Sequence, residues 1–253
     1  DTVSKQAAAS FDIDGITVTV GGMSKGSGMI HPDMATMLCV ITTDAVISKG
    51  LLQKALSEVV RNSFNMISVD RDTSTNDTAL LLANGAAGNK EICEGTPEYD
   101  SFVKALKHVA VTLARMMASD GEGATKLLEV TVVNAADEDD ARVLAKSVIT
   151  SNLVKTAVYG SDANWGRIMC ALGYSGKEFN PDIVDISINS VSGSLQLVEN
   201  GMAADYSEDI ATKILSDKEV SVICDMKSGD ARAVAWGCDL TYDYVKINGD
   251  YRS

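Results

Sequence analysis

The sequence contains few of the residues that build the commonest metal and nucleophile sites. Among 253 residues there are only two histidines, His31 and His108. A three-histidine metal site is therefore excluded, and a Ser-His-Asp or Cys-His device would have to use one of these two. There are five cysteines, an odd number without C-x-x-C spacing: Cys39, Cys93, Cys170, Cys224 and Cys238. We expect mostly buried, reduced thiols in a cytoplasmic protein rather than a zinc site or a disulfide framework.

Long apolar runs and excess positive charge are also lacking. No run approaches the roughly 20 apolar residues of a membrane helix, and the opening "DTVSKQ" shows no signal peptide. The net charge is −13 and the isoelectric point is about 4.5. Because an acidic surface repels phosphate groups, we expect neither nucleic acid nor an anionic membrane as a partner.

Short strands and helices are mixed along the whole chain. Apolar–polar alternation predicts strands, and a helical apolar period predicts helices, of which one has Ser48 as a candidate cap. We predict strands at 11–22, 37–44, 181–190 and 195–201, helices at 47–68, 99–123 and 164–176, a strand then a helix at 127–152, a helix then a strand at 207–227, and a strand then a tail at 231–253. The pattern predicts an α/β (α+β) protein with helix-covered sheets and a domain boundary near residue 128.

The segment "GGMSKGSGMIHPDMATMLCVITTD", residues 21–44, joins a glycine-rich loop to a short apolar strand. Such loops bring the backbone close to a ligand or to another part of the chain. The spacing does not match the phosphate loop G-x-x-x-x-G-K-[ST], and Pro32 interrupts a G-x-G-x-x-G register. Anion binding through Lys25 and the glycines is one interpretation, and a purely structural loop is a second.

Thr36, at the junction of loop and strand, gives a third interpretation. A threonine hydroxyl is a weak nucleophile that needs a base. If the chain cut itself between Ala35 and Thr36, the new α-amine, with a pKa of about 7.7–8.0, would activate the hydroxyl. The upstream glycines and Pro32, the small Ala35 and the strand behind Thr36 all suit this chemistry. The residues alone leave the three interpretations open.

Five segments resemble blocks of one known family, in the expected order. They are "KGSGMIHPDMATML", "TSTNDTALLLANG", "DGEGATK", "NWGRIMCALG" and "YVKINGDYRS". The chain thereby resembles, from end to end, the ornithine acetyltransferase family, also called glutamate N-acetyltransferase. The resemblance implies an αββα-type layered sandwich, similar to N-terminal nucleophile hydrolases, with a second, smaller α/β domain. Residues 1–128 would belong to the catalytic domain, and 129–253 would form a C-terminal α/β domain whose tail returns to the active site.

The family resemblance also implies a reaction. The precursor is expected to cut itself between Ala35 and Thr36, and Thr36 then carries an acetyl group from N-acetylornithine to glutamate in arginine biosynthesis. No metal or dissociable cofactor is implied, although some members accept acetyl-CoA as donor. Two alternatives are an amidohydrolase or aminopeptidase that uses the same threonine, and a non-catalytic anion-binding module.

Substrate-binding positions carry over from the matching motifs. They are Lys25, Thr36, Glu122, Asn248 and Ser253. A substrate carboxylate pairs with a lysine, and a substrate amine pairs with a carboxylate. Without the resemblance, Glu122 would be read as a solvated charge, and the last residues as a frayed terminus.

The tail from residue 242 onward is expected to be ordered. Tyr242, Tyr244 and Tyr251 can bury their rings while their hydroxyls find partners. A docked tail would bring Asn248 and Ser253 to the substrate.

The sequence departs from the family pattern at its start, because only 35 residues precede Thr36. Family members have a longer upstream segment, which includes a Thr-Gly oxyanion-hole pair and a substrate-contacting threonine. We therefore expect a missing upstream chain as a partner, in a heterotetramer of two alpha and two beta chains. Each absent oxyanion donor would cost on the order of 10²–10³ in rate.

Overall fold

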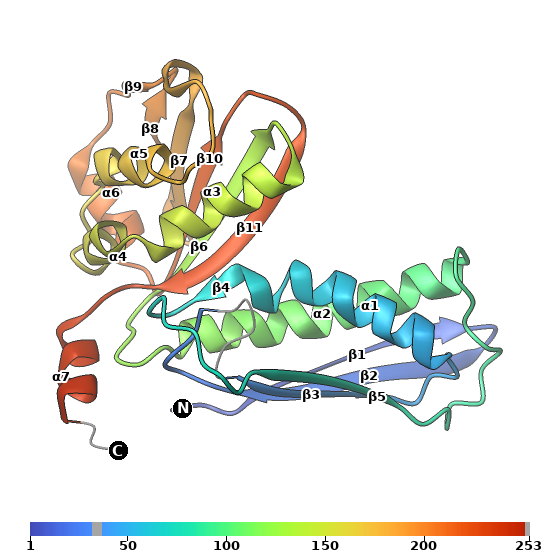
Figure 1. The fold of residues 1–253 in the computed structure, drawn as a ribbon. Coiled ribbons are helices and arrows are strands. Elements are labelled where there is room, and N and C mark those ends of the chain that lie inside the picture. Colours follow the sequence, from blue (N-terminus) through green and yellow to red (C-terminus); the bar gives the residue numbers. More distant parts are fainter. Residues whose placement is uncertain (32–36, 251–253) are drawn as a thin grey trace. The chain divides into compact units, whose positions relative to one another are not determined.

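The chain divides into two compact units. The computed structural model describes residues 1–31 and 37–250. Unit 1 comprises Asp1–Asn65 and Asp72–Met117, and unit 2 comprises Met66–Arg71 and Ala118–Ser253. The main division lies a short way before the boundary expected near residue 128. Each unit combines a sheet with helices (Figure 1), so the mixed α/β class with layered sheets is confirmed.

Unit 1 is a four-stranded sheet with helices on one face (Figure 1). The strand order is β1-β2-β3-β5, in which β1–β2 and β2–β3 are antiparallel and β3–β5 is parallel. The elements are β1 (Lys5–Ile13), β2 (Ile16–Lys25), β3 (Leu38–Thr43), α1 (Lys49–Arg61), β5 (Thr78–Ala83) and α2 (Pro97–Ser119). These layers correspond to one sheet and one helix layer of the expected sandwich.

The single strand predicted at 11–22 is wrong, because residues 5–25 form a hairpin. Asp14 and Gly15 make its turn, with φ angles of 52° and 84°. Two positive φ angles are typical of a type I′ turn, for which Asp-Gly is a strong sequence signal. The signal was therefore present in the sequence.

The helix layer lies close to the sheet at Gly22. A Cβ at this position would lie 3.0 Å from the Ile41 side chain and 3.2 Å from Leu113 of α2. Helix α1 begins where predicted, since Ser48 Oγ accepts a hydrogen bond from the Leu51 amide at 3.4 Å. The inner face of the sheet is thus closely packed against α2 at Gly22.

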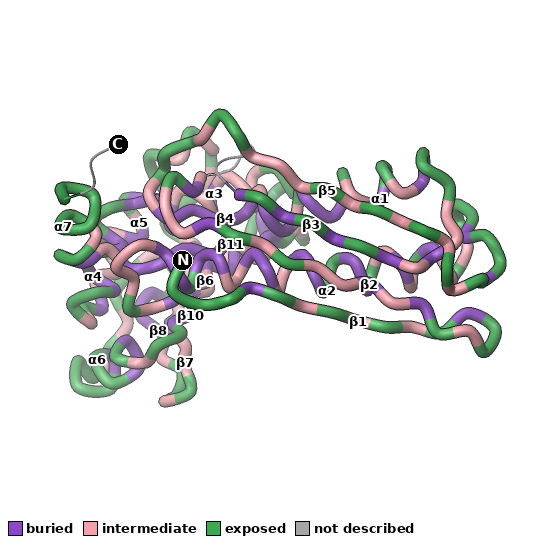
Figure 2. Tube along the Cα trace, turned by 90° about the horizontal axis from the view of Figure 1, so that it is seen from below, coloured by how far each residue is buried: buried purple, intermediate pink, exposed green. Residues whose placement is uncertain are grey.

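The opposite face of this sheet carries exposed apolar side chains. Along β3, Cys39 and Ile41 are buried, whereas the alternate residues point outward. We call the following residues the outer face, with their exposed fractions: Met23 64%, Leu38 50%, Val40 39%, Leu80 47% and Leu82 55%. Figure 2 views the sheet from this side and shows its strands largely as exposed or intermediate. A groove of about 510 Å³ runs over β1, β2 and β3. Exposed apolar patches of this kind mark interaction surfaces.

Unit 2 is built on a seven-stranded mixed sheet in the order β4-β11-β6-β10-β7-β8-β9. Helix α3 packs on β6 and β11, and α6 packs on β7 and β8. The strands are β4 (Ile67–Ser68), β6 (Leu127–Ala135), β7 (Asp185–Ser190), β8 (Gly193–Glu199), β9 (Met202–Ala203), β10 (Glu219–Asp225) and β11 (Ala231–Cys238). The helices are α3 (Glu138–Thr150), α4 (Asn152–Tyr159), α5 (Trp165–Gly173), α6 (Glu208–Leu215) and α7 (Tyr242–Asp250), with short 3₁₀ helices at Phe64–Met66 and Pro181–Ile183.

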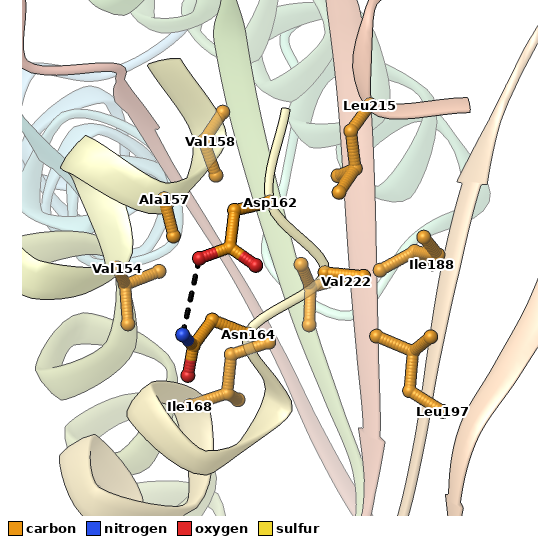
Figure 3. A pocket seen from close by; sticks show the side chains of 11 residues that line it. Val154, Ala157, Val158, Asp162, Asn164, Ile168, Ile188, Leu197, Leu215 and Val222 are labelled. Atoms are coloured by element: carbon orange, nitrogen blue, oxygen red, sulfur yellow. Dashed lines mark hydrogen bonds between the residues drawn. The ribbon is translucent and has the colours of Figure 1, made fainter. Parts of the chain in front are cut away.

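The interior of unit 2 leaves little room for a ligand. Side chains from α4, α5 and the sheet enclose a cavity of about 20 Å³ (Figure 3). Its two polar residues, Asp162 and Asn164, are hydrogen-bonded to each other at 3.1 Å. A cavity of this size holds about one water molecule.

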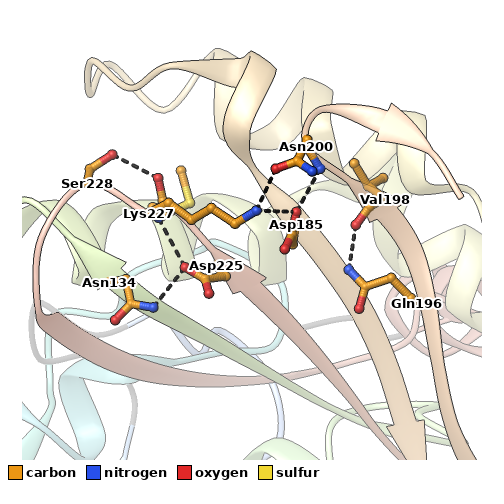
Figure 4. A network of polar contacts seen from close by, with 9 residues as sticks. Asn134, Asp185, Gln196, Val198, Asn200, Asp225, Lys227 and Ser228 are labelled. Carbon is orange, nitrogen blue, oxygen red and sulfur yellow. Dashed lines mark hydrogen bonds and ion pairs between the residues drawn. The ribbon is translucent and has the colours of Figure 1, made fainter.

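Hydrogen bonds and an ion pair connect strand ends and loops at one end of the unit 2 sheet (Figure 4). Lys227 Nζ lies 2.7 Å from Asp185 Oδ1 and 2.9 Å from Asn200 Oδ1. Asp225 accepts a hydrogen bond from the Asn134 side chain at 2.9 Å. These contacts join segments that lie far apart in the sequence.

The tail predicted after the last strand is a helix, α7, up to Asp250. The expectation that Tyr242 buries its ring is wrong, because Tyr242 is 82% exposed. Tyr244 is half-buried, and Tyr251 lies outside the described residues.

Candidate active site

Lys25 lies beside the strand that follows the candidate nucleophile. It is the last residue of β2 and pairs with Leu38, the first residue of β3. Directly paired residues of antiparallel strands point to the same face, so exposed Lys25 shares the outer face with Leu38. Ala35 and Thr36 lie outside the described residues, immediately before Met37.

The backbone of Met37 is held on both sides. Its N–H donates to Asp77 Oδ1 at 2.6 Å, and its carbonyl accepts from the Thr78 amide at 2.9 Å. The second oxygen, Asp77 Oδ2, is buried and accepts no hydrogen bond from the described residues. Burial raises the pKa of Asp77, while the Met37 amide and the charge of Lys25 act in the opposite direction. Asp77 lies in the segment "TSTNDTALLLANG", but no sequence signal assigns it a role.

Glu122 and Asn248, which were predicted to share a function, meet within unit 2. Asn248 Nδ2 donates to Glu122 Oε2 at 2.9 Å and to the Tyr244 carbonyl at 3.1 Å. Of the five predicted substrate-binding residues, these two are in contact. Lys25 belongs to unit 1. Thr36 and Ser253 fall outside the described part of the chain.

The approach of α7 to the "DGEGATK" loop depends on Gly123. Thr241 Oγ1, which caps α7 by accepting from the Tyr244 amide at 3.4 Å, donates to the Gly123 carbonyl at 2.7 Å. Gly123 has a φ of +69°, and a Cβ there would lie 2.6 Å from the Tyr244 nitrogen. Both the backbone conformation and the lack of space therefore favour glycine.

Two charged residues anchor the far end of the same loop. Buried Asp239 accepts from the amides of Thr125 at 2.8 Å and Lys126 at 3.0 Å. Lys126 Nζ donates to the carbonyls of Val158 and Leu215, each at 2.7 Å. Burial lowers the pKa of Lys126, and the nearby Asp239 partly opposes this shift. The loop that carries Glu122 is thus fixed at both ends.

The cysteines fall into a buried and an exposed group. Cys39, Cys224 and Cys238 are buried as expected, whereas Cys93 and Cys170 are exposed. Burial raises the pKa values of Cys39 and Cys224 to about 12, which disfavours the thiolate. Residues 1–31 and 37–250 contain no group of three His, Cys, Asp or Glu side chains placed to hold a metal ion. In the same ranges, no helix combines the length and apolar character needed to cross a membrane.

Comparison with known proteins connects this arrangement to one family. The family model described as the ArgJ family matches residues 1–253. The "Arginine biosynthesis bifunctional protein ArgJ" of Caldanaerobacter subterraneus subsp. tengcongensis is 54% identical over the whole chain, which covers 63% of that relative. The "Arginine biosynthesis bifunctional protein ArgJ 1" of Clostridium acetobutylicum is 56% identical over the whole chain, which covers 62% of its length. The chain therefore spans less than two thirds of these relatives.

A solved structure agrees in fold. The crystal structure of arginine biosynthesis bifunctional protein argJ from Bacillus halodurans matches with a TM-score of 0.80 and 46% sequence identity. The match covers 84% of this chain and 98% of the solved chain. With a family model that matches every residue, relatives above 50% identity and the same fold in a solved structure, the chain belongs to the ArgJ family.

Proposed function

We propose that this chain is the part of an acetyltransferase that carries the nucleophile and moves an acetyl group from N-acetylornithine to glutamate. The observation that carries the proposal is the match of the ArgJ family model to residues 1–253, a range that includes the candidate nucleophile Thr36. Relatives with this match are named as arginine biosynthesis proteins. The protein then works in arginine biosynthesis, in the cytoplasm.

The chemistry follows from an N-terminal threonine. Cleavage between Ala35 and Thr36 frees an α-amine whose pKa of about 7.7–8.0 suits a general base near neutral pH. Thr36 Oγ attacks the acetyl carbonyl of N-acetylornithine, and the ornithine amine leaves after it takes a proton. The amine of glutamate then attacks the acetyl ester, which releases N-acetylglutamate and restores the hydroxyl. Neither step needs a metal or a dissociable cofactor, and acetyl-CoA could replace acetylornithine as donor.

Charge complementarity supports the substrate-binding roles. An amino-acid substrate offers a carboxylate to Lys25 and an amine to the carboxylate of Glu122. The hydrogen bond from Asn248 uses Glu122 Oε2 and leaves Oε1 available to a substrate. Thr36 and Ser253 complete the proposed set.

The outer face supports a partner for unit 1. Its exposed leucines, valine and methionine would be covered by apolar surface of similar extent. We take the occupant to be the upstream chain of the same precursor, because the relatives are longer than this chain by more than a third of their own length. That segment would also supply the oxyanion-hole donors. Two such chain pairs would form the heterotetramer.

Acetyl transfer by the full-length protein tests the proposal. The protein is incubated with N-acetylornithine labelled in the acetyl group, with and without glutamate. Label in N-acetylglutamate supports the transferase. Free acetate at equal rates in both reactions would instead identify a hydrolase, and absence of any turnover or adduct would favour a binding module.

A further inference from the structure

At the start of β3, a side chain accepts a backbone hydrogen bond that the backbone of a neighbouring strand would normally accept. Met37 precedes β3 and Asp77 precedes β5, at the same end of the parallel β3–β5 pair. The Met37 carbonyl is bonded by the Thr78 amide, as in a regular ladder. Its N–H donates to Asp77 Oδ1 at 2.6 Å, and Met37 is only 2% exposed. A carboxylate therefore ends the ladder immediately after Thr36.

The contact restrains the orientation of the peptide group to which the Met37 N–H belongs. The peptide unit is planar, so an acceptor that fixes the direction of one N–H also fixes the plane of the peptide that contains it. A hydrogen bond to an ionised acceptor is shorter and stronger than a neutral one. Asp77 is thus suited to hold the Met37 amide in one orientation.

A carboxylate is an energetically unfavourable acceptor for the Met37 amide if its role is purely structural. Only Oδ1 is used, while Oδ2 is buried without a partner among the residues described. A buried polar atom that lacks a hydrogen bond lowers stability. Burial also raises the pKa of Asp77 because it disfavours the charged form, and the Met37 amide and Lys25 oppose this only in part. Departures from full polar satisfaction are expected at functional sites.

We propose that Asp77 is a positioning residue for the proposed nucleophile: it fixes the Met37 amide and the start of β3, the strand that follows Thr36 in the sequence. The inference rests on the proposed function, in which Thr36 carries the acetyl group. It assigns to Asp77 an effect on the chemical step, not on substrate binding.

The test compares three variants of the full-length, processed protein. Asp77→Ala removes the acceptor, and we expect kcat to fall about 10- to 100-fold, as misplacement by a fraction of an ångström to one ångström does. We expect KM to change by less than about threefold, since only the transition state is affected. Asp77→Asn keeps an oxygen acceptor for the Met37 amide, so it should restore most of kcat.

Asp44→Ala is the matched control. Asp44 Oδ1 accepts from the Thr19 amide at 2.8 Å, just beyond the opposite end of β3. Its loss removes the same kind of hydrogen bond from the same sheet, so the thermal midpoint should fall while kcat stays near wild type. If Asp77→Ala does not fold, Asp77→Glu, which displaces the acceptor by one methylene, replaces it in the comparison.

Two results would overturn the inference. One is a kcat for Asp77→Ala equal to that of Asp44→Ala, and the other is an Asp77→Asn variant as slow as Asp77→Ala. Both leave the proposed function intact, because wild type and Asp44→Ala still transfer acetyl. A wild-type protein that transfers no acetyl group would overturn the proposed function itself.

Discussion

Asn248 on α7 donates a hydrogen bond of 2.9 Å to Glu122, although the two residues are 126 positions apart in the sequence. This contact joins the C-terminal helix to the "DGEGATK" loop. Gly123 and Thr241 support it from the backbone side, since Thr241 Oγ1 donates to the Gly123 carbonyl at 2.7 Å.

Glu122 and Asn248 should contribute jointly to substrate affinity. Glu122→Gln removes the charge offered to the substrate amine, and we expect KM for N-acetylornithine to rise roughly tenfold, which corresponds to about 1.4 kcal/mol. Asn248→Ala should have a smaller effect of the same sign. Because the side chains are in contact, the double variant should cost less than the sum of the single variants. Glu199→Gln, at an exposed carboxylate on β8, is the control. An unchanged KM for Glu122→Gln would show that Glu122 is a surface charge with no role in substrate binding.

Gly123→Ala should weaken the packing of α7 against the "DGEGATK" loop. The new Cβ would meet the Tyr244 nitrogen at 2.6 Å, and the φ of +69° is unfavourable for alanine. Gly176→Ala is the matched control, because Gly176 has a φ of +84° but no atom within 4 Å of the added Cβ. Both variants should lose about 1–2 kcal/mol from the backbone conformation. Only Gly123→Ala should speed hydrogen exchange in residues 242–250. Equal exchange in the two variants would contradict a close contact at Gly123.

Lys126→Met should destabilise unit 2. The substitution keeps the aliphatic length but leaves the carbonyls of Val158 and Leu215 without their ammonium donor. Both carbonyls keep a hydrogen bond from Ser161, so the expected cost is that of losing hydrogen bonds to a charged group, about 1.5–3 kcal/mol. Lys213→Met, at an exposed lysine of α6, should change the free energy of unfolding by no more than about 0.5 kcal/mol. Urea unfolding of the two variants measures the difference, and equal stability would exclude the anchoring role of Lys126.

The stability effect of Asp77 should depend on pH with a defined sign. Its pKa in the folded protein is raised above the ordinary 3.8. The folded state therefore holds this proton more tightly, so the charged carboxylate costs stability at neutral pH, and the cost disappears as pH falls through the folded pKa. Asp77→Asn cannot titrate. Its stability relative to wild type should be highest near pH 7 and should decline toward about pH 4. A relative stability that rises on acidification would contradict the raised pKa.

A charge on the outer face should prevent association with the upstream chain. Leu82→Lys places an ammonium where 55% of the leucine is exposed in this chain. If that surface becomes buried on assembly, an unpaired charge there is strongly unfavourable. Co-purification of the two chains should be lost, although the variant unit still folds. Val191→Lys is the control, at a residue of unit 2 that is 94% exposed. Normal assembly of Leu82→Lys would exclude this face as the interface.

Short-range sequence patterns predicted many of the helices and strands. Ser48, Asp137 and Asn164 stand at helix starts, and each accepts a hydrogen bond from an amide three residues later. These caps are readable because their partners are close in sequence. The hairpin at Asp14 and Gly15 was equally readable but was missed. Helix α7 was missed because it lacks the usual signature of a packed helix: none of its described side chains is buried, and Gly249, a weak helix former, lies near its end.

Long-range contacts could not be predicted from the pattern. The Met37–Asp77 hydrogen bond spans 40 positions and depends on the parallel pairing of β3 and β5. Nothing in "TSTNDT" distinguishes Asp77 from its polar neighbours. Lys155 is similarly hidden: it is only 2% exposed and donates to the Val69 carbonyl at 2.8 Å. The proposed substrate-binding residues came from resemblance to a family, not from composition or periodicity.

The central claim is that Thr36 becomes an N-terminal nucleophile that carries the acetyl group. Intact-mass spectrometry of the full-length protein, incubated with N-acetylornithine in the absence of glutamate, tests it most directly. The account predicts a chain that begins at Thr36 and gains the mass of one acetyl group, which disappears when glutamate is added. Thr36→Ala should stay uncleaved and gain nothing. A normally processed Thr36→Ala, or an acetyl group on another residue, would contradict the account.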